Sequence, residues 1–141
     1  MNPLEFFTWL CWQMIVICLV LNPGLAVPAL AGLIWACVEL VRTWSNARAQ
    51  SLWLFPPFVI PFLILVIATV FEGKEEAVAI MPWPVLVVYA LAISHLAIGV
   101  AQALILDRLT APIKLGFNTF QAWMSYCAAW LANSAITNVW P

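Results

Sequence analysis

Charged side chains are scarce in this sequence: of its 141 residues, 8% are charged and 66% are hydrophobic. Soluble domains carry roughly 25% charged residues, because their surface must meet water. With five basic and six acidic residues and a net charge of −1, the chain also lacks the basic surface that nucleic-acid binding requires. The composition therefore excludes an ordinary soluble domain and a nucleic-acid partner, and it predicts an integral membrane protein.

The spacings that mark catalytic and metal sites are missing as well. The sequence has one histidine, and its four cysteines form no C-x-x-C pair; they are Cys11, Cys18, Cys37 and Cys127. A single imidazole without a second ligand cannot define a metal geometry. No nucleophile with a neighbouring base and no glycine-rich phosphate loop is recognisable, so we expect no metal site and no catalysis by this chain alone.

What the sequence does contain is a series of long apolar stretches. Because a transmembrane helix needs about 20 mostly apolar residues, we predict transmembrane helices over residues 4–21, 25–41, 53–71 and 83–106. The tripeptide Asn22-Pro23-Gly24 predicts a turn that reverses the chain between the first two helices. The alternative is a re-entrant hairpin over residues 4–41. The prediction is one all-α transmembrane domain of four transmembrane helices and a C-terminal helical segment.

The C-terminal segment, residues 115–140, has no charged side chain but is rich in Asn, Gln, Ser and Thr. Apolar residues such as Phe117 share one face of a helix there, while Asn118, Gln121 and Ser125 share another. A helix that lies on the membrane surface usually has Lys or Arg on its wet face. We therefore favour a fifth span whose polar face turns toward protein, ahead of an amphipathic interfacial helix.

Lysine and arginine set the expected orientation, because these residues are more frequent in cytoplasmic loops. Residues 42–51 and 107–114 each hold two of them, and residues 72–82 hold one. We therefore expect the first two segments in the cytoplasm and the third outside. If residues 4–21 cross the membrane completely, the amino terminus is cytoplasmic too. The location we expect is a bacterial cytoplasmic membrane, which the chain crosses several times.

Three prolines fall within the predicted helix over residues 53–71. Pro56 and Pro57 lie in its opening turn, where a missing N–H matters little, whereas Pro61 removes an interior hydrogen bond. We therefore expect a kink at Pro61, with neighbouring helices supplying a partner for the freed carbonyl.

His95 lies near the middle of the predicted helix over residues 83–106, with Gly99 and Gln102 on the same face at i+4 and i+7. An ionisable side chain at membrane depth suggests a function, because leaving it in lipid is costly. It could ligate haem or a metal, relay protons, or line a quinone pocket. We favour a neutral histidine that is hydrogen-bonded across helices, with Gly99 allowing a neighbouring helix to approach.

The run from His95 through Gly99 to Gln102, followed by Asp107, resembles the haem-binding helix of the small membrane anchors of succinate dehydrogenase. The resemblance covers about thirteen residues, and it implies haem ligation by His95. Asp107 comes one position later than in that family. The predicted helices over residues 4–41 have no counterpart in a three-helix anchor, and no matching arginine precedes residue 53.

Two further features concern packing. Glu39 lies one turn before Arg42, a spacing that allows an ion pair on one helix face. Small residues and one proline recur every four positions and lead toward Glu39, at Gly24, Pro28, Gly32 and Ala36. Such a ridge lets membrane helices pack closely. We expect Gly24, Gly32, Ala36 and Gly99 to be helix contacts, and we favour a structural ion pair at Glu39 over a cation or proton site.

These observations leave three functional hypotheses. The first is a non-catalytic subunit that scaffolds or seals a larger membrane complex, with other membrane subunits and lipids as partners; the small size and nearly absent extramembrane mass favour it. The second is a small homo-oligomeric channel or transporter that uses His95, Gln102 and Glu39, but a route needs symmetry or repetition to enclose it. The third is a haem- or quinone-binding anchor of a respiratory complex. We expect the first, with bound lipids and no cofactor.

Overall fold

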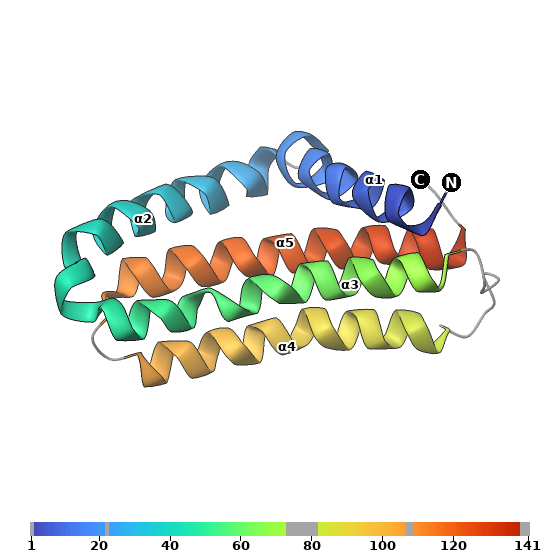
Figure 1. Ribbon diagram of the computed structural model, residues 1–141. Helices are drawn as coiled ribbons and strands as arrows, with labels where there is room; N and C mark the ends of the chain where they lie inside the picture. The colour runs from blue at the N-terminus through green and yellow to red at the C-terminus, as the bar shows by residue number, and fades with distance from the viewer. Residues whose placement is uncertain (1, 22, 73–81, 107–108, 139–141) are drawn as a thin grey trace.

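The computed structural model describes residues 2–21, 23–72, 82–106 and 109–138, and every regular element in these ranges is helical (Figure 1). In chain order the elements are α1 (Pro3–Val16), the π-helical turn η1 (Ile17–Leu21), α2 (Pro23–Ser51), the 3₁₀ turns η2 (Leu52–Leu54) and η3 (Pro56–Phe58), α3 (Val59–Val70), α4 (Trp83–Ile105) and α5 (Ala111–Thr137). The predicted all-α fold class is confirmed. Some predicted features lie outside the described residues, namely most of the loop over 72–82, the pair Asp107 and Arg108, and residues 139–140.

Within the described ranges, three stretches of helix are long and apolar enough to cross a membrane: Gly24–Ser45, Arg48–Val70 and Trp83–Ile105. They overlap the predicted helices over residues 25–41, 53–71 and 83–106. The first two extend further toward the basic segment that joins them, because a helix continues through polar residues once it leaves the hydrocarbon. The apolar helix Pro3–Leu19 is shorter than these three.

α5 runs through the middle of the bundle, with α1 and α2 on one side and α3 and α4 on the other (Figure 1). It is less apolar than the three candidate spans, and its Gln121 and Ser125 side chains are fully buried. The outer helices instead expose large apolar side chains, such as Ile34 of α2 and Leu96 of α4. In lipid a polar side chain needs a protein partner, whereas an apolar one does not. The polar face that the sequence predicts for this segment thus turns toward protein at Gln121 and Ser125, and the fifth span remains a prediction.

α1 and α2 follow one another along the length of α5 and do not fold back on each other (Figure 1). Leu10 of α1 packs with the C-terminal half of α5, and Ala36 of α2 packs with its N-terminal half. The predicted reversal at residues 22–24 is therefore wrong, and residues 4–41 form neither two antiparallel crossings nor a re-entrant hairpin. Pro23 is the first residue of α2, where a missing N–H costs nothing, so Pro23 and Gly24 begin a helix.

This arrangement divides the bundle into two ends. The end of α2, the end of α4 and the beginning of α5 lie at one end, so Arg42, Arg48 and Lys114 share it (Figure 1). The beginnings of α1 and α4 and the ends of α3 and α5 lie at the other. The amino-terminal helix therefore begins on the side of Glu72, opposite the described basic residues.

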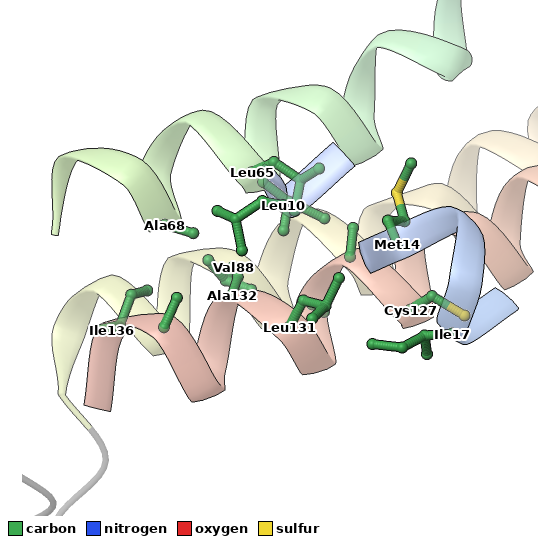
Figure 2. Close-up of a cluster of buried hydrophobic side chains, with 14 of the residues drawn as sticks. Leu10, Met14, Ile17, Leu65, Ala68, Val88, Cys127, Leu131, Ala132 and Ile136 are labelled. Carbon is green, nitrogen blue, oxygen red and sulfur yellow. The ribbon is translucent and has the colours of Figure 1, made fainter. Parts of the chain in front are cut away.

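Two apolar clusters hold α5 in place. The larger joins α1, α3, α4 and α5, and Figure 2 shows the side chains of Leu10, Leu65, Val88 and Leu131 converging there, each no more than 1% exposed. The smaller lies near the basic end of the bundle and combines α2, η2, α4 and α5; its buried members are Ala36, Leu40, Leu54, Leu106, Leu109, Ile113 and Phe117. Membrane helices gain little from excluding water, so this close packing, together with hydrogen bonds, supplies the association energy.

Candidate functional site

The helix that leads from Arg48 to Val70 is interrupted by the prolines at its centre. Pro56 and Pro57 have no N–H, so the carbonyls of Leu52 and Trp53, four residues earlier, lose their α-helical donors. The backbone tightens into two 3₁₀ turns there, with Phe55 N–H donating to the Leu52 carbonyl at 3.4 Å. The interruption is thus at Pro56 and Pro57. The expected kink at Pro61 is wrong, because α3 begins at Val59 and Pro61 lies in its first turn, where no intrahelical donor is needed.

Two glutamines from neighbouring helices supply the missing donors. Gln102 of α4 donates from Nε2 to the Trp53 carbonyl at 2.6 Å. Gln121 of α5 donates from Nε2 to the Leu54 carbonyl, also at 2.6 Å; that carbonyl is free because the Phe58 N–H bonds to Phe55. Irregular backbone at membrane depth persists only where protein satisfies it. The two amides therefore hydrogen-bond the broken segment, residues 52–58, to α4 and α5.

A side chain of α5 also hydrogen-bonds to the backbone of the other irregular turn, η1. The π-helical turn η1 has a wider hydrogen-bond spacing than an α-helix, and the indole N–H of Trp123 on α5 donates to its Cys18 carbonyl at 3.3 Å. α5 therefore supplies a side-chain donor to each of the two interruptions that face it.

His95 joins this network from α4 and is 1% exposed. Its Nδ1 lies 2.6 Å from the Ser125 hydroxyl, and its Nε2 lies 3.2 Å from Oε1 of Gln121. Both partners are on α5. The histidine thus bridges the two helices at a point where no charged side chain of the described residues is bonded to it.

The bonding directions follow from the Leu54 carbonyl, which can only accept. Gln121 must present its NH₂ to that carbonyl, so its oxygen faces His95 and can only accept from it. Nε2 of His95 therefore carries the hydrogen, and the Ser125 hydroxyl donates to the free lone pair of Nδ1. A neutral imidazole satisfies every group in this chain of three hydrogen bonds.

Two buried acceptors of the described residues remain without a partner: Oε1 of Gln102 and Oδ1 of Asn118. Asn118 of α5 lies against Gly99 and donates from Nδ2 to the Gly99 carbonyl at 3.3 Å. A Cβ on Gly99 would come 3.4 Å from Asn118 Cγ. Gly99 thus lies at the contact between α4 and α5.

Glu39 lies apart from this network. Its carboxylate pairs with Arg42 at 2.9 Å, at the spacing that the sequence offered. The Arg42 side chain is 70% exposed and that of Glu39 is 23% exposed. His95 and Gln102, by contrast, are both tied to the broken segment, Gln102 directly and His95 through Gln121.

The ridge on α2 contacts α5 in part. Gly32 and the fully buried Ala36 lie against Gly116 of α5, where an added Cβ would overlap the Gly32 carbonyl oxygen and lie 2.6 Å from Ala36 Cβ. Gly24 differs from expectation, because nothing lies within 4 Å of the position of its Cβ. Sequence reasoning missed Gly116, whose only signal is a glycine inside an otherwise continuous helical pattern.

These features define the class of protein: the chain is an all-α membrane protein whose polar side chains at membrane depth bond helices and helix interruptions to one another. No protein-family model, no curated protein and no solved structure matches it.

A double-mutant cycle tests the role of Gln102. Pro57→Ala restores an N–H that can reach the Trp53 carbonyl, so Gln102→Leu should destabilise the Pro57→Ala protein less than the natural one. We expect a coupling of about 1 kcal/mol in unfolding free energy, the usual size of one hydrogen bond. Denaturation in mixed detergent micelles, followed by circular dichroism, measures it. Additive effects would mean that the amide does not serve the proline interruption.

Proposed function

We propose that this protein is a non-catalytic subunit of a larger membrane assembly, where it packs against other integral membrane chains and lipids. The observation that carries the proposal is the use of the polar side chains. His95, Gln121 and Ser125 are bonded to one another, and Gln102 and Gln121 to the backbone, so these groups serve cohesion of the bundle. Among the described residues, the outer helices expose large apolar side chains that other membrane chains and lipids can contact.

The arrangement gives less support to a channel or transporter built on His95, Gln102 and Glu39. A shared route needs these groups to line one passage, yet Glu39 is paired with Arg42 on α2 while His95 and Gln102 bond toward α5 and η2. Haem ligation through His95 would require one ring nitrogen to give up a hydrogen bond that now joins α4 to α5. We therefore rank the haem or quinone anchor third, as before.

The test is purification from the native membrane in a mild detergent, using an affinity tag, followed by quantitative mass spectrometry and a visible absorption spectrum. A subunit should carry other membrane chains in a fixed ratio that survives a second purification through the partner. Copies of this chain alone would favour the channel, and a Soret band would favour the haem anchor. Either result would overturn the proposal.

For orientation, we propose that the basic end of the bundle lies in the cytoplasm and that α1 begins on the outer side. The bias of Lys and Arg supports the first part. The cytoplasmic amino terminus expected from the sequence depended on a reversal at residues 22–24. Since α1 and α2 together run along α5 once (Figure 1), the beginning of α1 falls on the face opposite Arg42 and Arg48.

Single introduced cysteines test this topology by their labelling. Leu4→Cys and Glu72→Cys should react with a membrane-impermeant maleimide added to intact cells, whereas Ala49→Cys should react only after permeabilisation. All three positions are exposed. The unmodified protein is the control, because its cysteines lie in apolar helices. If Leu4→Cys instead behaves like Ala49→Cys, the amino terminus is cytoplasmic and α1 and α2 cross the membrane separately.

A further inference from the structure

A cavity of about 600 Å³ lies between α3 and α4, beside the proline interruption. Its wall is apolar and includes Pro57, Ile60 and Leu63 on one side and Ile98 and Ala101 on the other. Sites for small molecules usually measure about 300–1,000 Å³ and combine an apolar wall with few polar groups. The size and the lining of this cavity are those of such a site.

Two of the described residues that line this wall have a polar side-chain group, Trp53 with its indole N–H and Gln102 with its amide, and the amide offers an acceptor. Its Nε2 must face the Trp53 carbonyl, because that oxygen can only accept, and its Oε1 is thereby turned away from it. This oxygen is buried and has no partner, and the residue as a whole is 8% exposed. A buried acceptor without a donor is costly, so a molecule that brings a donor to this oxygen is favoured over one that does not.

The cavity opens toward the side of the bundle that lipid would cover. Four residues of its rim expose large apolar side chains to that side: Trp53 (67%), Val59 (54%), Leu63 (46%) and Ile105 (71%). No charged side chain is among the described residues that line it. An occupant therefore arrives through the membrane, is mostly apolar, and carries no charge on the part that enters.

We propose that this cavity binds a neutral, largely apolar amphiphile whose single hydroxyl donates a hydrogen bond to Oε1 of Gln102. The occupant must bring a donor such as a hydroxyl, because ester, ether and ketone oxygens accept but cannot donate. The apolar body fills the space between α3 and α4 in place of a membrane acyl chain. This binding site is independent of whether the protein is a subunit of a complex.

The experiment uses the purified protein in detergent and two photoactivatable probes, a diazirine-bearing oleyl alcohol and its methyl ether. In the ether a methyl group replaces the hydroxyl hydrogen, so the ether keeps an acceptor but has no donor. The alcohol should label peptides within residues 53–63 and 98–106, and the ether should label them about tenfold less at equal concentration, the ratio that corresponds to about 1.4 kcal/mol.

Three variants identify the cause. Gln102→Met keeps the volume but removes the acceptor, so alcohol and ether should label equally. Gln121→Met removes the same kind of donor to the broken segment but contributes nothing to the cavity, so the preference for the alcohol should persist. Ala101→Leu fills the cavity without changing a hydrogen bond and should abolish labelling by both probes.

Equal labelling of the natural protein by alcohol and ether would overturn the proposal, as would a preference that persists in Gln102→Met. Absence of labelling by either probe would overturn it too.

Discussion

Gly116→Ala is expected to lower the free energy of unfolding by about 2 kcal/mol, the usual cost of overfilling a packed site. The added methyl group would overlap the backbone oxygen of Gly32 and lie 2.6 Å from Ala36 Cβ. Neither obstacle can rotate away, because one is backbone and the other is a Cβ atom. α2 and α5 must therefore move apart, and the contacts along this pair of helices weaken together. Unfolding in mixed micelles, followed by circular dichroism, gives the value.

Two matched controls separate this clash from a general effect of replacing glycine in a helix. Gly24→Ala places its methyl group in open space, and Gly32→Ala places it 3.7 Å from Gly116 Cα, an ordinary contact. Both should leave stability within about 0.5 kcal/mol of the natural protein or raise it slightly, since alanine favours helix. A loss in Gly24→Ala as large as that in Gly116→Ala would refute the packing explanation. The larger Gly32→Leu should disrupt the pair as Gly116→Ala does.

His95→Leu is expected to cost about 2 kcal/mol, because it leaves both the Ser125 hydroxyl and Gln121 Oε1 buried without a partner. His95→Gln should cost less than about 1 kcal/mol, since an amide can donate to Gln121 and accept from Ser125. The same unfolding assay measures both. Ile93→Leu serves as the neutral control, because the Ile93 residue on α4 is 64% exposed.

The two His95 variants also distinguish the functional hypotheses. A haem ligand would give a Soret band that both variants lose, because neither glutamine nor leucine provides an imidazole nitrogen to iron. A proton relay would leave both variants stable but inactive. Equal stability of His95→Leu and His95→Gln would therefore contradict the structural role proposed for this residue.

Sequence reasoning succeeded where the physical cause is local or is imposed by the membrane. The length of the apolar stretches predicts the helices, and the i,i+3 spacing predicts the Glu39–Arg42 pair. The inward direction of Gln121 and Ser125 follows from the cost of exposing polar groups to lipid. Each of these inferences needs only the residues of one helix and a property of the solvent.

Sequence reasoning failed where a side chain contacts a backbone atom or a helix that is distant in the sequence. The carbonyls of Trp53 and Leu54 have no side-chain signature, so the donors Gln102 and Gln121 could not be assigned to them. The role of Gly116 depends on α2 crossing it, about 80 positions earlier in the chain. The reversal at residues 22–24 was predicted from turn propensity alone, and the same residues are equally suited to begin a helix.

The central position of α5 has a consequence for biosynthesis. This helix leaves the ribosome after α1, α2, α3 and α4, the helices that pack around it. Until then the Leu54 carbonyl lacks its Gln121 donor and His95 lacks its partners on α5. The earlier helices must therefore stay in the membrane while these polar groups have no hydrogen-bond partner. α5 is also less apolar than the candidate spans, and its insertion therefore depends on the polar sites that those helices already offer. Chains that end before residue 111 should accordingly be short-lived in the cell, although they contain all three stretches apolar enough to cross the membrane.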